Sequence, residues 1–222
     1  MVGRKSELEK LKQILDTDLQ NSNSSICVIG EAGIGKSKLV REASLYAIKK
    51  NIRVELIGGI SIYKDTPFFV LKNLADKLLR LTYAKGEAAN YPVLGDLALS
   101  EREQIALEKL ISPNPGAVAN WDIPSDDKRR AIQGAVAAVV SKAAANSPLV
   151  LLIEDLHDVD LESALSLKYI ISECAEYPLS VIITTRPQAT ELASSILEKH
   201  LTLEALTAEA VSYTHLTLPT KA

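Results

Sequence analysis

The 222-residue sequence predicts an α/β fold, a three-layer sandwich with a five-stranded, mainly parallel sheet. Helix-type and strand-type segments alternate along most of the chain. The strand-type segments at residues 149–153 and 179–185 are almost continuously apolar, which is typical of parallel strands buried on both faces. A glycine-rich turn at residues 30–37 joins a short β-branched run to an amphipathic helical segment. Together these features predict a parallel sheet covered by helices on both faces.

Composition and charge favour a cytoplasmic domain with a proper core. Hydrophobic residues make up 47% of the chain, and 25 basic against 28 acidic residues leave a net charge of -3. This balance gives no electrostatic footprint for nucleic acid, and we expect no direct nucleic-acid binding. No apolar run approaches the length of a membrane span, so no membrane contact is expected. Cys27 and Cys174 lie in apolar segments and are expected to be buried thiols.

In the first third of the chain, the sequence predicts two helices and two strands. Ser6 and Glu9 have capping-box spacing ahead of an apolar helical stripe, so a helix should precede the first strand, which we expect at residues 25–30. A second strand is expected at residues 51–59. The helix between these strands, from residue 36 to residue 50, places five apolar residues at helical spacing: Leu39, Val40, Ala43, Ala47 and Ile48.

The middle of the chain predicts three more helices. Thr66 as N-cap and Pro67 at the first helical position should begin one of them. Ser100 and Glu103 form another capping box before an amphipathic segment that ends near residue 111. After a proline-rich, irregular connection, an alanine-rich helix is expected from residue 125 to about residue 145.

The last third predicts three strands, of which the first two end in polar residues. The strand at residues 149–153 is followed by Glu154 and Asp155, and Asp160 is the candidate N-cap of the next helix. The strand that begins at residue 179 ends in Thr184, Thr185 and Arg186. A fifth strand is expected at residues 200–206.

The stretch GEAGIGKS satisfies the phosphate-binding pattern GxxxxGK[ST]. Glycine allows successive backbone N–H groups to turn inward and cradle phosphate oxygens at a helix N-terminus, where the helix dipole favours negative charge. Lys36 would reach the β- and γ-phosphates, and Ser37 would bind Mg²⁺. The predicted nucleotide site in this stretch consists of Gly30, Glu31, Ala32, Gly33, Ile34, Gly35, Lys36 and Ser37.

Two carboxylates and an arginine complete the candidate catalytic site. One of Glu154 and Asp155 would hold Mg²⁺ and the other would orient or deprotonate the attacking water. Adjacent strand residues point to opposite faces, so the sequence leaves the two roles unassigned. A helix-entry acid pair is the alternative. Arg186 would sense the terminal phosphate if its strand lies between the other two, and a surface loop before Pro187 is the alternative for it.

The motifs VGRKSELEKL, GEAGIGKS, PLVLLIEDLHDVD, IITTRP and LTLEAL occur in an order that resembles the signal-transduction ATPases of the AAA+ class, known as STAND NTPases. The resemblance is strongest to the ATPase modules of bacterial multidomain adenylate/guanylate cyclases, large LuxR-type regulators and serine/threonine kinases with tetratricopeptide tails. It implies that Arg4 lies near the adenine or the phosphates, that Glu154 and Asp155 form Walker B, and that Arg186 is the sensor arginine. Relatives commonly carry Trp where this chain has Asp158. His157 is expected to be structural.

The resemblance implies a slow or regulated Mg²⁺-dependent ATPase module of a larger signal-transduction protein. Its nucleotide state would switch an attached effector or an assembly, with effector and repeat domains as partners and nucleotide-dependent self-association as a further option. Members of the family continue into a lid, and we expect this chain to be truncated before it. Two alternatives are a DNA-acting AAA+ ATPase related to replication initiators, which predicts a basic patch, and a P-loop small-molecule kinase, which needs an arginine-rich lid.

The last residues look foreign to the rest of the chain. VSYTHLTLPT, at residues 211–220, is the translation of a DNA sequence that resembles a transposase adapter used in sequencing libraries. An ordinary threonine-rich strand is the alternative. We therefore expect a domain at residues 1–210, truncated before the lid, followed by a non-native tail at residues 211–222.

Overall fold

In the computed structural model, five strands form one sheet in the order β2-β3-β4-β1-β5, and all four neighbouring pairs are parallel. The structure describes residues 3–21, 24–83, 94–114 and 116–205. The predicted α/β class and the five-stranded sheet are confirmed. The strands are β1 (Ser24–Ile29), β2 (Arg53–Gly58), β3 (Leu149–Glu154), β4 (Leu179–Thr185) and β5 (His200–Thr202).

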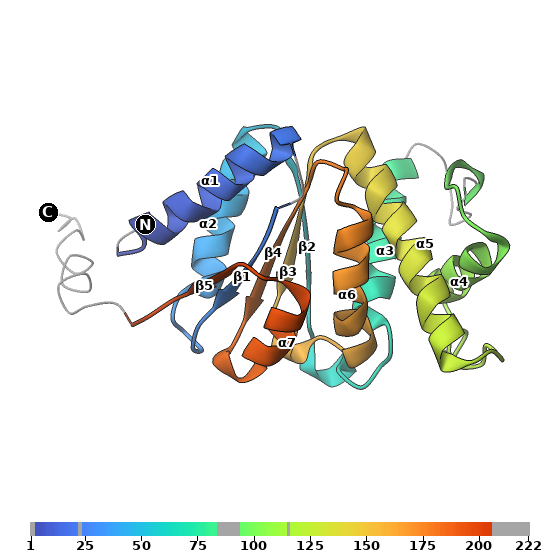
Figure 1. Ribbon diagram of the computed structural model, residues 1–222. Coiled ribbons are helices and arrows are strands. Elements are labelled where there is room, and N and C mark those ends of the chain that lie inside the picture. Colours follow the sequence, from blue (N-terminus) through green and yellow to red (C-terminus); the bar gives the residue numbers. More distant parts are fainter. Residues whose placement is uncertain (1–2, 22–23, 84–93, 115, 206–222) are drawn as a thin grey trace, which may run out of the picture.

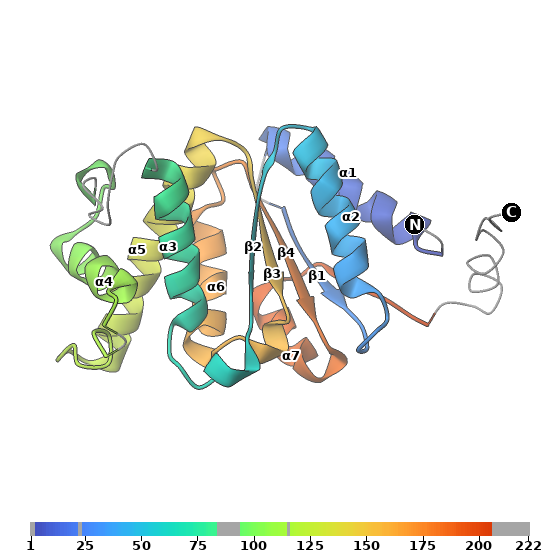
Figure 2. The same cartoon turned by 180° about the vertical axis from the view of Figure 1, so that it is seen from behind.

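Helices cover both faces of this sheet (Figures 1 and 2). One face carries α1 (Lys5–Asn21) and α2 (Lys36–Lys49). The other carries α3 (Phe69–Tyr83), α6 (Leu161–Glu173) and the short α7 (Thr190–Ile196). Outside α3 and α6 lie α5 (Ser125–Asn146) and, beyond it, α4 (Glu101–Ile111), which extend the sandwich by another layer.

Short 3-10 helices follow three of the strands at their carboxyl ends. These are η1 (Ser61–Tyr63) after β2, η3 (Leu156–Asp158) after β3 and η4 (Pro187–Ala189) after β4. A further one, η2 (Leu94–Asp96), precedes α4. None of the helices in the described ranges is long and apolar enough to cross a membrane.

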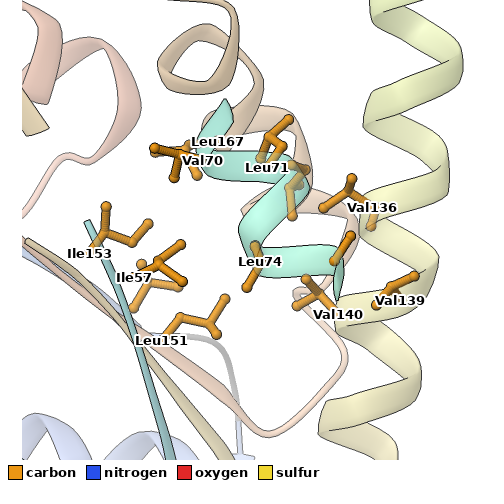
Figure 3. Close-up of a cluster of buried hydrophobic side chains, with 14 of the residues drawn as sticks. Ile57, Val70, Leu71, Leu74, Val136, Val139, Val140, Leu151, Ile153 and Leu167 are labelled. Atoms are coloured by element: carbon orange, nitrogen blue, oxygen red, sulfur yellow. The ribbon is translucent and has the colours of Figure 1, made fainter. Parts of the chain in front are cut away.

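The sheet divides the core into two because successive strand side chains point to opposite faces. Ile26, Val28, Val150, Leu152 and Ile182 belong to the cluster under α1 and α2. The alternate residues belong to the larger cluster on the other face, where Ile57, Leu151 and Ile153 lie opposite Leu71 and Leu74 of α3, and α3 packs in turn on Val136, Val139 and Val140 of α5 (Figure 3). Burying each such side chain contributes about 1.5–3 kcal/mol, so the apolar strands predicted from the sequence hold the layers together.

Two predicted helix starts are wrong. Helix α1 begins at Lys5, one residue before the expected cap, and the N–H of Leu8 donates to the carbonyl of Arg4. The hydroxyl of Ser6 donates to Glu7 at 2.7 Å, so Ser6 and Glu9 form no capping box. The capping box of Ser100 and Glu103 on α4, by contrast, is confirmed.

Helix α3 begins at Phe69, not at Pro67, and its cap comes from a distant part of the chain. Asp160 accepts hydrogen bonds from the N–H groups of Phe68 (2.8 Å) and Val70 (3.1 Å). Phe68 has a φ of 63°, a left-handed conformation that ends any helical turn begun at Thr66. The same carboxylate accepts from the N–H of Ser163, which confirms Asp160 as the N-cap of α6.

Several smaller expectations have mixed outcomes. Ile48, predicted to share the buried stripe of α2, is 54% exposed. Cys27 and Cys174 are buried free thiols, as expected, and burial raises the pKa of Cys27 to about 12. Strand β5 ends at residue 202, earlier than predicted. The domain boundary at residue 210 and the adapter-like tail lie outside the described residues.

Gly59 allows the chain after β2 to pack directly against the turn after β3. Its N–H donates to the carbonyl of Glu154 at 3.0 Å. A Cβ atom at this position would lie 2.3 Å from the backbone carbon of Asp158 and 2.5 Å from the nitrogen of Val159. Backbone atoms cannot retreat as a flexible side chain can, so any larger residue must push the two segments apart.

The substitution Gly59→Ala is therefore expected to lower the free energy of unfolding by about 1–3 kcal/mol. Urea unfolding followed by circular dichroism measures the change. Gly95→Ala is the matched control, since nothing lies within 4 Å of a Cβ atom at Gly95. Equal stability of the two variants would contradict the close packing of residue 59.

Candidate functional site

The sheet order brings the predicted site segments to one edge. Strand β4 lies between β1 and β3, as the interpretation of Arg186 required. Ile29 pairs with Thr185, and Ile153 pairs with Ile183. Because all of these strands are parallel, their carboxyl ends meet, and the segments that follow them line the same edge. In open α/β sheets ligands bind in the crevice outside these ends.

The glycine-rich loop has the backbone shape that anion binding needs. Gly33 and Gly35 have φ values of 74° and 101°, a region that favours glycine. Helix α2 begins directly after the loop, at Lys36, so the N–H groups of its first turn and its positive dipole end point back into the loop. The N–H of Gly30 donates to the carbonyl of Thr185 at 3.2 Å, which anchors the loop to β4.

Lys36 is a buried cation held over the loop. The residue is 8% exposed, and its Nζ donates to the carbonyls of Gly30 (2.7 Å) and Glu31 (3.0 Å). Burial lowers the pKa of Lys36, while the charge of Asp155 raises it and that of Arg186 lowers it. We find no carboxylate within ion-pair distance of Lys36 in the described part of the chain. Its charge is thus placed to meet an anion.

The two adjacent carboxylates have different surroundings. Glu154 is the last residue of β3, and strand alternation puts it on the face shared by Val150 and Leu152, which α1 and α2 cover. Ser37, exposed in the first turn of α2, belongs to the same side of the sheet. Asp155 has left the strand, and its side chain is 50% exposed.

Asp155 adopts a left-handed backbone conformation, with a φ of 54°. Its N–H donates to Oγ1 of Thr184 at 3.1 Å, which ties the turn after β3 to β4. Thr184 and Thr185 are both buried, so their hydroxyls are not open to the edge, whereas Arg186 is exposed at the end of β4. The charge of Arg186 lowers the pKa of Lys36 and of His157, so these groups share one electrostatic neighbourhood.

His157 lies in η3, two residues after Asp155. Its side chain is 13% exposed, and neither ring nitrogen has a hydrogen-bond partner. Nε2 lies 3.5 Å from a carboxylate oxygen of Asp158, and Nδ1 lies 4.0 Å from one of Asp155. Burial lowers the pKa of His157, against the opposing effect of the two carboxylates. Its carbonyl accepts a hydrogen bond from Lys64 at 2.6 Å.

Arg4 joins three segments that are far apart in the sequence. It is 4% exposed, and its guanidinium donates to the carbonyls of Ile34 (3.3 Å) and Glu204 and pairs with Glu7 at 2.9 Å. The phosphate loop, the start of α1 and the segment after β5 therefore meet at this side chain. The family resemblance implies a place for Arg4 near the adenine or the phosphates, and nothing local in the sequence indicates the contact with Glu204.

Comparison with known proteins agrees with this geometry. A family model described as AAA ATPase domain matches residues 1–183. An uncharacterized protein of Rhizobium meliloti (strain 1021) is 27% identical over 201 residues, covering 84% of this chain and 18% of the relative. The chain thus spans less than a fifth of the length of that relative.

Similar folds occur among solved structures. The ORC1 protein of Aeropyrum pernix, in complex with DNA, has a TM-score of 0.53 at 14% identity over 96% of this chain and 48% of its own. Trip13 from Rhizobiales has a TM-score of 0.50 at 11% identity, covering 97% and 68%. A STAND protein with a tetratricopeptide repeat sensor from Pyrococcus horikoshii has a TM-score of 0.48 at 18% identity, covering 99% and 26%. At these identities the first two likenesses show a shared fold.

The contacts of Arg4 generate a stability prediction. Arg4→Ala removes the ion-pair partner of Glu7 and the donor to the carbonyl of Ile34 in the glycine-rich loop, which should cost about 2 kcal/mol of unfolding free energy. Thermal and urea unfolding measure the loss, and limited proteolysis near residue 204 should accelerate. Lys5→Ala, at the neighbouring exposed position, is the control. A loss no larger than that of Lys5→Ala would show that Arg4 does not hold the loop.

Proposed function

The chain belongs to the AAA ATPase domain family, and on that premise we propose that it is the slow nucleotide switch of a larger signal-transduction protein of the STAND type. One observation carries the proposal. Lys36, a buried cation, contacts two carbonyls of a glycine-rich loop at a helix N-terminus, and the charges of Asp155 and Arg186 act on its pKa. The order of the sequence motifs supports the signal-transduction assignment.

The phosphates of ATP would bind at residues 30–37. The loop supplies N–H groups, the start of α2 supplies a positive dipole, and Lys36 would exchange its two carbonyl contacts for phosphate oxygens. Ser37 and Glu154 are on one side of the sheet and supply the oxygen ligands that Mg²⁺ prefers. When bound, the metal ion would neutralise part of the phosphate charge.

We assign hydrolysis to Asp155. Its carboxylate is half-exposed, and its charge raises the pKa of Lys36. This carboxylate would accept a proton from the attacking water. The water oxygen would bond to the γ-phosphorus while the bond from phosphorus to the bridging oxygen breaks. The leaving electron pair stays on ADP. Arg186, exposed at the tip of β4, would stabilise the charge on the transferred phosphoryl group.

Slow turnover suits a switch. Asp155 is 50% exposed, and efficient phosphoryl transfer depends on excluding water from the reacting groups. A site that binds ATP at the glycine-rich loop but leaves its general base in contact with solvent would hydrolyse ATP slowly. The protein would then stay in the ATP-bound state for long periods. In this proposal, other parts of a longer protein respond to that state, as the 18% coverage of the Rhizobium meliloti relative allows.

Nucleotide binding is expected to depend on Lys36. Lys36→Ala should weaken ATP binding by about a hundredfold or more, since it removes a charge-assisted contact to the phosphates. Isothermal titration with ATP and Mg²⁺ measures the affinity. Lys38→Ala, exposed two residues later on α2, is the control and should bind like the parent protein. Equal affinities of the two variants would remove the phosphate-loop assignment.

The two carboxylates are expected to separate in function. Asp155→Asn should bind ATP normally and slow single-turnover hydrolysis by about 10²- to 10⁴-fold, the usual contribution of a general base. Glu154→Gln should instead raise the Mg²⁺ concentration needed for half-maximal hydrolysis. An unchanged single-turnover rate in Asp155→Asn would exclude Asp155 as the general base.

The DNA-acting alternative has its own test. Salt-sensitive binding of duplex DNA by the parent protein would favour it.

A further inference from the structure

We infer that Asp160 is a positioning residue for hydrolysis: its carboxylate holds the turn that carries Asp155. The inference rests on the proposed ATPase function, since it assigns to Asp160 a control over the proposed base. Asp160 is 2% exposed, so its carboxylate is not open to a bound nucleotide. Its effect must pass through the turn at residues 155–160.

The carboxylate of Asp160 receives backbone N–H groups from two helices. One oxygen accepts from Phe68 (2.8 Å) and from Ser163 (2.9 Å), and the other accepts from Val70 (3.1 Å). The hydroxyl of Ser163 adds a fourth link, because it accepts from the N–H of Leu71 at 3.2 Å. The starts of α3 and α6 therefore converge on one buried negative charge, where both helix dipoles favour it.

The segment between β2 and α3 wraps the turn through further contacts. The N–H of Gly59 donates to the carbonyl of Glu154, and Lys64 donates to the carbonyl of His157 at 2.6 Å. The contact of Phe68 with Asp160 closes the wrap at its far end. Residues 59–68 are thus hydrogen-bonded along the turn after β3. The contact to Asp160 is the most buried of these hydrogen bonds.

This support matters because Asp155 has an unfavourable backbone. A residue other than glycine with a φ of 54° persists only where its surroundings fix it. The turn is fixed at its start by the bond from the N–H of Asp155 to Thr184, and within by the bond from the N–H of Asp158 to the carbonyl of Asp155 at 2.8 Å. Asp160 fixes its end.

Loss of the Asp160 carboxylate would release that end of the turn. Asp155 could then relax from the left-handed conformation and move its carboxylate away from the water that it activates. The phosphate loop at residues 30–37 would keep its shape, because its anchors are Thr185 and Arg4. A change at Asp160 should consequently lower the rate of hydrolysis and leave ATP affinity unchanged.

The experiment compares Asp160→Asn and Asp160→Ala with Ser100→Ala. Ser100 is the N-cap of α4, far from the edge, so its loss also weakens a helix start but leaves the turn alone. Asp160→Ala is expected to lower single-turnover hydrolysis by about ten- to a hundredfold with ATP affinity within about twofold of the parent. Asp160→Asn keeps one acceptor oxygen and should lose less. Ser100→Ala should lower the melting temperature without changing either quantity.

Hydrogen exchange supplies a readout that needs no nucleotide. The amides of Phe68, Val70 and Asp158 should exchange faster in both Asp160 variants than in Ser100→Ala. If Asp160→Ala does not fold, Asp160→Asn and Ser163→Ala carry the comparison.

The inference would be overturned by amide exchange in the turn that matches Ser100→Ala, or by hydrolysis at the parent rate when the turn amides have lost protection. A fall in hydrolysis that Ser100→Ala shares at equal loss of stability would also overturn it. Failure of the proposed function looks different, because the parent protein and Lys36→Ala would then be equal in ATP binding and hydrolysis.

Discussion

The parallel pairing of β1, β4 and β3 is the constraint on which the rest of the structure depends. It aligns Ile29 with Thr185 and Ile153 with Ile183, so the three strands end together. The end of each strand then contributes one part of the candidate site, namely a glycine-rich loop, a carboxylate pair and an arginine. Had any of these strands run antiparallel, its last residue would lie at the opposite edge, more than a strand length away.

Backbone groups, more than side-chain ion pairs, hold the charged residues at this edge. Lys36 contacts two carbonyls, Arg4 contacts two more, and Asp160 accepts three N–H groups. For Lys36 and Asp160, such contacts satisfy the buried charge without neutralising it, whereas Arg4 also pairs with Glu7. The glycine-rich loop with Lys36 and the acidic turn after β3 therefore stay separate features of the candidate site.

Local signals in the sequence were enough for the sheet and most helices. Apolar runs identified the strands, since parallel strands are buried on both faces and need no alternation. The capping box at Ser100 was right because both of its partners lie within one turn. The prediction at Thr66 failed because a carboxylate from elsewhere in the fold decided where α3 begins. Phe68 lies 92 positions before Asp160, whose carboxylate accepts its N–H. At Ser6 a competing local contact to Glu7 replaced the expected capping box.

By itself, then, the sequence determined the fold class and predicted the glycine-rich loop and the two acids as parts of one site. These follow from residue types at fixed short spacings, where steric limits on glycine and the burial of apolar side chains act locally. Only the tertiary structure decided that Asp155 adopts a left-handed backbone, that Arg4 ties the loop to the segment after β5, and that Asp160 joins two helices. Each of these three features depends on hydrogen bonds between residues that are far apart in the sequence. The spacing of residues along the chain does not predict such contacts.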